Sequence, residues 1–276
     1  MDFTDNVRKF LDSNGFAVSP SGRNGLRVLD MCPGSGKPVR IIPVPVRHGT
    51  FEEAGRFRAA AESCLDNAIA DGARPVIVAE DLWMSRPEMM QPRLLAQLGR
   101  FVSVFARNTA VRRIVKAEAA GFLDRWHTYG YASCRYRYGL FAKDGRMVAV
   151  SCFSAPRNWD KNGHIIRPFE WVRYASLPDT RVVGGMGKML EAFIREVHPD
   201  DVMSYADREW TDGKVYETLG FAREGGRSPV RFNVDADTWK RVPSKLSDGQ
   251  DIPGGTVFRH INLGSIKYRL KLTDYE

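Results

Sequence analysis

The chain has 276 residues, enough for two domains of ordinary size, and 43% of its residues are hydrophobic while 27% are charged. No stretch of about 18 consecutive apolar residues occurs, which argues against a membrane-spanning helix. The first residues lack the apolar core of a secretory signal, so we expect a cytoplasmic protein. The formal net charge of +8 suits a nucleic acid or an anionic cofactor, and equally a basic face that contacts only solvent.

The four cysteines give no sign of a metal site. Cys32, Cys64, Cys134 and Cys152 form no CxxC pair, and no histidine stands at ligand spacing from them. The sequence therefore predicts no bound metal, and it predicts reduced thiols.

Hydrophobic periodicity and turn residues organise the first 105 residues as a small α/β unit. Val7, Phe10 and Leu11 fall at helical spacing and predict an amphipathic first helix. The elements expected next are a strand over 27–30, a turn over 31–36, a strand over 39–46, a helix over 51–70, a strand over 75–79 and a helix over 92–98. Prolines within 39–46 predict that this strand lies at a sheet edge.

The pattern changes after a predicted hinge at 107–109. We expect strands over 111–115, 135–141, 147–153, 165–175, 201–205, within 221–235 and over 265–272, helices over 116–126, 184–197 and 212–219, a hairpin turn at 143–146 and a turn-rich stretch over 248–255. These elements predict an accessory α/β domain over 1–105, a second α/β domain over 106–240, and a C-terminal extension over 241–276.

A glycine-rich loop between a strand and a helix carries the strongest chemical signal. It consists of Val182, Val183, Gly184, Gly185, Met186, Gly187 and Lys188. Glycines let the backbone approach a ligand closely, and a helix N-terminus with a nearby lysine attracts an anion. The loop therefore predicts a pyrophosphate site, although glycines in such turns also serve sterics alone.

The segment downstream of this loop makes the pattern more specific. A strand over 201–205 follows the helix, and a short helix then ends in Tyr216-Glu217-Thr218-Leu219-Gly220-Phe221. This arrangement resembles the GNAT superfamily of N-acyltransferases, in which a loop of pattern [QR]xxGx[GA] opens the central helix. Here Val182 occupies the first position of that pattern, and Arg181 lies one residue earlier.

The resemblance implies a mixed central sheet flanked by helices over 106–240, with two central strands that splay apart, and a bound acetyl-CoA or another acyl-CoA. A strand near 169–175 is expected to offer backbone groups to the pantetheine arm, and the loop over 182–188 is expected to hold the pyrophosphate. Tyr216 matches the tyrosine that protonates the leaving thiolate in many such enzymes, since a phenol keeps its proton at neutral pH. The alternative is that Tyr216 is only a packing residue.

Three strings narrow the resemblance further: Phe169-Glu170-Trp171-Val172-Arg173-Tyr174, Ser204-Tyr205-Ala206-Asp207 and Asp212-Gly213-Lys214-Val215-Tyr216. They are similar to a GNAT-like domain of bacteriophage proteins, among them the Mom-like proteins, which modify the exocyclic amine of adenine in DNA, and a set of phage proteins classed as endonucleases. The resemblance covers roughly residues 105–235.

By this resemblance the catalytic candidates are His127, Arg173, Asp207 and Tyr216. Asp207 follows a strand end, where a carboxylate can take a proton from an amine or orient a base edge. Arg173 could pair with Asp207 or bind a phosphate, and a purely structural salt bridge is the alternative. His127 ends a helix, where the dipole favours a cation for structural reasons as well.

The N-terminal unit resembles the restriction-endonuclease-like domain of the phage relatives, through the string over 77–83. Asp30 could be the first acid of such a nuclease, but the strand over 39–45 offers neither a carboxylate nor a lysine to complete a magnesium site. A unit of nuclease ancestry would therefore be inactive here and kept for DNA binding or dimerisation, with Arg47 and His48 on a basic edge. An accessory domain of another kind is equally consistent.

Three functions remain open. The first is an acyl-CoA-dependent N-acyltransferase that modifies a nucleic-acid base amine, with DNA as partner. The second is an N-acetyltransferase for a small-molecule or protein amine. The third is a DNA-binding or nuclease-related protein whose GNAT-like domain is not catalytic. The sequence leaves the oligomeric state open, a homodimer included.

Overall fold

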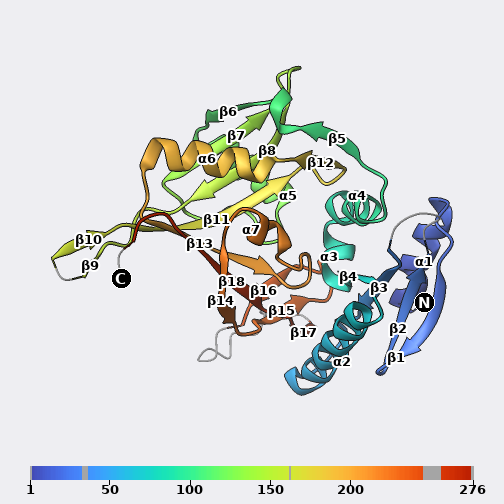
Figure 1. The fold of residues 1–276 in the computed structure, drawn as a ribbon. Helices are drawn as coiled ribbons and strands as arrows, with labels where there is room; N and C mark the ends of the chain where they lie inside the picture. Colours follow the sequence, from blue (N-terminus) through green and yellow to red (C-terminus); the bar gives the residue numbers. More distant parts are fainter. Residues whose placement is uncertain (1, 33–36, 162, 245–255, 275–276) are drawn as a thin grey trace. The chain divides into compact units, whose positions relative to one another are not determined.

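The computed structural model describes residues 2–32, 37–161, 163–244 and 256–274 (Figure 1). Most of the turn expected over 31–36, and all of the turn-rich stretch expected over 248–255, lie outside these residues. Among the helices described, none is long and apolar enough to cross a membrane.

The chain forms two compact units that interleave along the sequence. One comprises Met1–Gln91, Asp207–Trp210 and Ser228–Gly264, and the other comprises Pro92–Ala206, Thr211–Arg227 and Ser265–Glu276. This division does not follow the linear boundaries expected at 105 and 240, because a segment beyond residue 227 returns to the first unit and the last strand belongs to the second.

The first unit contains a four-stranded sheet, a three-stranded sheet and its helices. The four-stranded order is β1 (Ser19–Arg23), β2 (Leu26–Met31), β3 (Val39–Val44) and β4 (Arg74–Ala79), and the three-stranded order is β16 (Arg241–Pro243), β15 (Arg231–Asp235) and β17 (Val257–Ile261). The helices are α1 (Phe3–Ser13), α2 (Phe51–Ala70) and α3 (Glu80–Ser85). The Thr50 side chain caps α2 by accepting from the backbone N–H of Glu53.

The edge position predicted for the strand over 39–46 is wrong. β3 lies inside the sheet, antiparallel to β2 and parallel to β4, and all its residues are buried. Proline is tolerated because β2 pairs only with Val39–Ile41, so Pro43 lies beyond the part of the ladder that needs an N–H on that side.

The second unit is built on a seven-stranded mixed sheet, which confirms the predicted α/β class. Its order is β14 (Ala222–Arg227), β18 (Ser265–Lys271), β13 (Asp201–Asp207), β11 (Pro168–Ser176), β8 (Met147–Phe153), β7 (Tyr136–Phe141) and β6 (Ala110–Arg113). β11 runs parallel to β13 and antiparallel to β8, and the hairpin predicted between β7 and β8 is present.

Smaller elements complete this unit. They are β5 (Val102–Phe105), which pairs in parallel with β12 (Thr180–Val183), the 3-10 turn η1 (Ala106–Asn108), and the hairpin of β9 (Trp159–Lys161) and β10 (His164–Ile166). The single strand predicted over 165–175 is therefore split, since β10 ends at Ile166 and β11 begins at Pro168. The helix predicted from Pro92 begins earlier, as α4 (Pro87–Gln97), with Pro92 in its interior.

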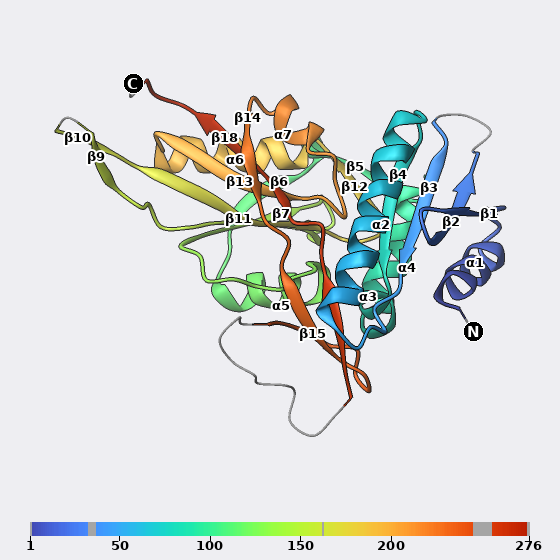
Figure 2. The same cartoon turned by 90° about the horizontal axis from the view of Figure 1, so that it is seen from below.

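Helices cover both faces of the seven-stranded sheet. α5 (Lys116–Trp126) lies on one face, over Val150 and Cys152. α6 (Gly185–Val197) and α7 (Lys214–Thr218) lie on the other, and Figure 2 shows α5 and α6 on opposite sides of the sheet. We call these the α5 face and the α6 face.

The core of the α6 face is centred on Phe193 of α6. Its ring stacks on Phe153 of β8, with centroids 3.9 Å apart and planes 2° apart. Phe169 and Tyr136 meet the same ring edge-on. This aromatic cluster fixes α6, and with it the glycine-rich loop that precedes α6, against the sheet.

We expect Phe193→Ala to lower the free energy of unfolding by about 3–5 kcal/mol, because it leaves a cavity at the centre of this cluster. Urea denaturation measures the change. Ile165→Ala, at an exposed position of the same unit, is the control and should change stability by less than about 0.5 kcal/mol. Equal effects of the two substitutions would contradict the assigned core.

Candidate active site

The main feature of the site is the separation of two parallel strands. β11 and β13 pair from Pro168 opposite Asp201 to Trp171 opposite Ser204, and no further pairing between them is present in the described residues. β11 continues to Ser176 along β8, and β13 continues to Asp207. The two strands therefore part beyond Trp171 and Ser204, as the sequence resemblance implied, and we call the region where they part the cleft.

A β-bulge lies at the mouth of this cleft. The register of β11 against β8 shifts between Trp171, which faces Phe153, and Arg173, which faces Cys152. Directly opposed residues of an antiparallel pair point to the same face. Trp171 thus points to the α6 face and Arg173 to the α5 face.

The glycine-rich loop opens α6 beside this cleft. Gly184 caps the helix with φ of +76°, a left-handed conformation that glycine adopts without strain. A Cβ on Gly185 would lie 2.6 Å from Val182 Cγ1 and 3.2 Å from the Tyr174 hydroxyl, so only glycine fits between β12 and β11. Gly184 offers no side-chain cap to the first turn of α6, and a helix N-terminus of this kind attracts an anion.

The other loop residues hold the loop in place. Val182 and Val183 belong to β12, and Met186 packs against the core of the α6 face. Lys188 donates from Nζ to the backbone carbonyls of Ala106 and Thr109. Its charge therefore anchors the turn around η1, a use that the sequence did not predict, and its expected contact with a pyrophosphate stays a prediction.

Tyr216 of α7 lies at the cleft and is 8% exposed. The Ser204 hydroxyl is 3.1 Å from both the Tyr216 hydroxyl and the Trp171 carbonyl oxygen. Since a serine has one proton and a carbonyl only accepts, Ser204 donates to Trp171 and can accept from Tyr216. Burial raises the pKa of Tyr216, so the phenol keeps its proton at neutral pH.

Two further residues at the cleft were not predicted as site residues. The Tyr174 side chain of β11 is partly buried near Gly185, and burial, with the nearby Tyr216, raises its pKa. Its ring meets that of Trp171 edge-on at 6.0 Å. Tyr174 and Ser204 both stood in the strings that carried the sequence resemblance, but only the fold shows that they meet Trp171 and Tyr216.

Two predicted candidates, Arg173 and His127, both form hydrogen bonds to Gly130, in one turn on the α5 face. His127 caps the C-terminus of α5, and its carbonyl accepts from the N–H of Gly130. The Arg173 guanidinium donates from Nε to the Gly130 carbonyl at 3.0 Å and from Nη1 to the Val172 carbonyl at 2.8 Å. Burial lowers the pKa of Arg173. These contacts give Arg173 a role in holding the turn beside the bulge.

Asp207, the last residue of β13, groups with the first unit. Its Oδ1 accepts from the backbone N–H of Glu209 at 3.0 Å, which closes a turn after the strand. Its pairing with Arg173 and its role beside Tyr216 stay predictions.

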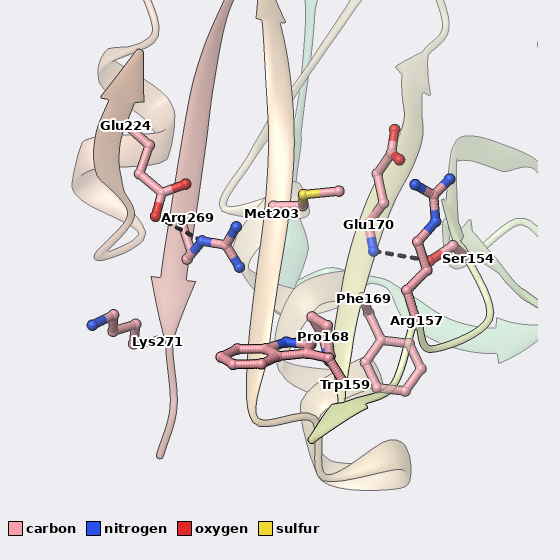
Figure 3. Close-up of a pocket in the computed structure, with 10 residues that line it drawn as sticks. All are labelled: Ser154, Arg157, Trp159, Pro168, Phe169, Glu170, Met203, Glu224, Arg269 and Lys271. Atoms are coloured by element: carbon pink, nitrogen blue, oxygen red, sulfur yellow. Dashed lines mark hydrogen bonds and ion pairs between the residues drawn. The ribbon is translucent and has the colours of Figure 1, made fainter. Parts of the chain in front are cut away.

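A cavity of about 440 Å³ opens on the α5 face beside the mouth of the cleft (Figure 3). Glu170 and Met203, the register pair immediately before Trp171 and Ser204, form part of its wall. The remaining lining residues are Ser154, Arg157, Trp159, Pro168, Phe169, Glu224, Arg269 and Lys271. Sequence reasoning missed this site, because its lining comes from five strands and a loop.

The charges that line the cavity are partly balanced. Arg269 is paired with Glu224 at 2.7 Å and with Asp201 at 2.8 Å. The backbone N–H of Ser154 donates to the Glu170 carbonyl, and the Ser154 Oγ accepts from the Glu170 N–H. Trp159 is 43% exposed, so the cavity offers an aromatic surface together with Arg157, Lys271 and the Glu170 carboxylate.

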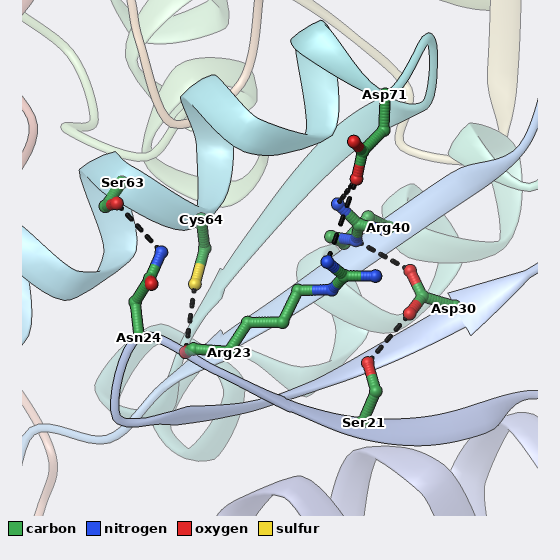
Figure 4. A network of polar contacts seen from close by, with 8 residues as sticks. All are labelled: Ser21, Arg23, Asn24, Asp30, Arg40, Ser63, Cys64 and Asp71. Atoms are coloured by element: carbon green, nitrogen blue, oxygen red, sulfur yellow. Dashed lines mark hydrogen bonds and ion pairs between the residues drawn. The ribbon is translucent and has the colours of Figure 1, made fainter.

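Asp30, the acid expected for a nuclease, takes part in an ion pair and a hydrogen bond within the first unit. Asp30 accepts from Arg40 at 2.7 Å and from Ser21 at 2.8 Å, and Arg40 also pairs with Asp71 (Figure 4). Within the described part of the chain, no cluster of three or more His, Cys, Asp or Glu side chains is placed to hold a metal ion.

The basic edge predicted at Arg47 and His48 is wrong for His48. That ring is buried, stacks on Phe57 at 4.1 Å, and has its pKa lowered by burial. Arg47 is paired with Glu80 at 2.8 Å.

No protein-family model and no curated protein matches this chain. Solved structures similar to it include a histone acetyltransferase HPA2 and related acetyltransferase from Corynebacterium glutamicum (10% identity, 61% of this chain and 98% of that one, TM-score 0.38). Others are the ribosomal-protein-S5-alanine acetyltransferase from Vibrio fischeri (11%, 61% and 96%, 0.37) and a GNAT-family acetyltransferase from Bacillus anthracis (12%, 59% and 95%, 0.33). At these TM-scores the likenesses place no residue of this chain in an active site.

We expect Gly185→Ala to lower stability by about 1–3 kcal/mol, because the new Cβ collides with Val182. A double-mutant cycle with Val182→Ala tests the cause, since removing Val182 Cγ1 should recover part of the loss. Urea denaturation of the four proteins measures it. Strictly additive effects would mean that the two residues do not touch.

Proposed function

We propose that the chain is an acyl-CoA-dependent N-acyltransferase of the GNAT type. The observation that carries this proposal is the cleft between β11 and β13, which begins at Trp171 and Ser204 and has Tyr216 at its mouth. Parallel strands that part inside a sheet leave backbone groups without ladder partners. An extended amide-bearing ligand such as pantetheine can pair with them.

The residues at the cleft fit such a cofactor. Gly185 leaves room that a side chain would fill, and the uncapped first turn of α6 suits a pyrophosphate. Among the described residues, the buried indole N–H of Trp171 has no hydrogen-bond partner, so a ligand in the cleft could satisfy it. A bound acyl-CoA would supply an acyl group as a thioester.

In this proposal Tyr216 holds the proton that a departing thiolate takes up. Its raised pKa keeps the phenol protonated across the neutral range, and Ser204 fixes the position of the hydroxyl. Because Ser204 is in turn fixed by the Trp171 carbonyl, the acid is positioned by the residues at which the strands part.

We expect Tyr216→Phe to lower kcat by about 10²-fold or more while acetyl-CoA affinity, measured by calorimetry, changes less than about threefold. Loss of a general acid affects the chemical step, whereas the ring still packs. Collapse of affinity would make Tyr216 a binding or packing residue. Ser204→Ala is the matched variant and should give a smaller loss, because it removes only the positioning bond.

Calorimetry of the wild-type protein with acetyl-CoA also tests the class of protein. No heat of binding from acetyl-CoA or longer acyl-CoA donors would overturn the acyltransferase proposal and favour a non-catalytic DNA-binding role.

For the acceptor we propose the exocyclic amine of a nucleic-acid base. The net charge of +8 favours a polyanionic partner, and the cavity of the α5 face combines an exposed tryptophan with Arg157 and Lys271. Aromatic and cationic side chains together suit a base and its phosphate. The Glu170 carboxylate could accept a proton from the attacking amine.

We expect nucleoside mass spectrometry to find an acylated base in DNA from cells that express the protein. Trp159→Ala should lower this modification about 5–150-fold, since stacking on one base contributes roughly 1–3 kcal/mol, and Arg157→Ala should lower it through the loss of a phosphate contact. Arg146→Ala, an exposed arginine of the β7–β8 hairpin, should leave it unchanged. Unmodified nucleosides together with tight acetyl-CoA binding would overturn the acceptor alone and favour a small-molecule or protein amine.

A further inference from the structure

Two cysteines lie together on the α5 face of the seven-stranded sheet. Cys152 of β8 is fully buried, and Cys134, just before β7, is half-buried. Both pack into the apolar cluster beneath α5, both are free thiols, and each thiol shifts the pKa of the other. The function proposed above uses neither of them.

Three polar side chains, those of Tyr131, Arg137 and Arg173, lie near this pair. The Tyr131 hydroxyl is 3.6 Å from Cys134 Sγ, and Arg137 donates to the Cys134 carbonyl at 2.6 Å. In the sheet, Cys152 stands between Arg137 of β7 and Arg173 of β11, its direct register partners. Two guanidinium groups therefore flank the thiols, and positive charge of this kind favours a thiolate.

The neighbouring Cys152 thiol has the largest influence on the pKa of Cys134. Together with Tyr131 and Arg137, and against the opposing effect of burial, it lowers the pKa of Cys134 to about 6. The Cys134 thiolate and burial raise the pKa of Cys152, so this second thiol keeps its proton.

We propose that Cys134 and Cys152 form a peroxide-reactive thiol pair, in which Cys134 reacts with the peroxide and Cys152 then forms a disulfide with it. The Cys134 thiolate attacks one oxygen of a hydroperoxide; the O–O bond breaks, hydroxide or alkoxide leaves and takes a proton, and Cys134 becomes a sulfenic acid. Cys152 then gives up its proton and attacks Cys134 Sγ, so that the S–O bond breaks and water leaves. Two thiols are oxidised and one peroxide is reduced.

Alkylation by iodoacetamide at pH 6 tests the reactivity of Cys134. Relative to an ordinary thiol with a pKa near 8.5, the thiolate fraction rises about 150-fold, and the lower nucleophilicity of an acidic thiol removes roughly tenfold of this. We therefore expect Cys134 to react about tenfold faster in the folded chain than in urea. Exposed Cys32 is the internal reference and should show no such gain. Slower reaction of Cys134 in the folded chain, which burial alone predicts, would overturn the proposal.

Treatment with one equivalent of hydrogen peroxide tests the pairing. Non-reducing peptide mapping of the wild-type protein should give a peptide in which Cys134 and Cys152 are linked. Cys152→Ser should stop at the sulfenic acid, which dimedone traps, whereas Cys64→Ser should still form the disulfide. If wild-type protein yields no linked Cys134–Cys152 peptide, the proposal fails, whether or not the Cys152 variant folds. Neither alkylation nor peptide mapping depends on acetyl-CoA binding, so failure here is distinct from failure of the proposed function.

Discussion

The arrangement of the second unit depends on one constraint, namely that β11 keeps β8 as a partner while it leaves β13. Buried backbone groups without partners are costly, so neighbouring strands normally pair along their whole length. Here the ladder between β11 and β13 ends at Trp171 and Ser204, and the Ser204 hydroxyl donates a hydrogen bond to the Trp171 carbonyl. The bulge that follows turns Arg173 to the α5 face, as bulges near functional sites commonly redirect a side chain.

Several elements could be predicted from the sequence because local interactions determine them. The helices over 51–70 and 116–126 and the strand over 147–153 have their predicted limits, since hydrophobic periodicity and caps such as Thr50 are encoded within a few residues. The position of the glycine-rich loop was predictable for the same reason. Gly184 needs a positive φ and Gly185 needs space, and both requirements select glycine.

The remaining features depend on contacts between distant parts of the chain. Nothing local in residues 241–243 shows that they belong with the N-terminal segment, yet Arg241 forms a buried ion pair with Asp81, 160 residues earlier. Glu209 lies in the same unit, where burial and the charge of Asp207 raise its pKa to about 8, while burial and Arg241 lower the pKa of His260 to about 3. Both groups are uncharged at neutral pH, so their approach to 3.9 Å is not an ion pair.

Long-range pairing also explains why the candidate site was only half predictable. Tyr216 lies on the α6 face, whereas Glu170 and the cavity lie on the α5 face, because alternate residues of a strand point to opposite faces. A continuous sheet would keep a proton donor on one face from acting with an acceptor on the other. In the proposed function the two can meet only where the strands part, and the last register pairs before the cleft, Glu170 with Met203 and Trp171 with Ser204, supply one residue pair to each face. A slip of β11 by one residue would turn Glu170 to the α6 face and Trp171 to the α5 face, so this register is what leaves one residue pair on each face where the strands part.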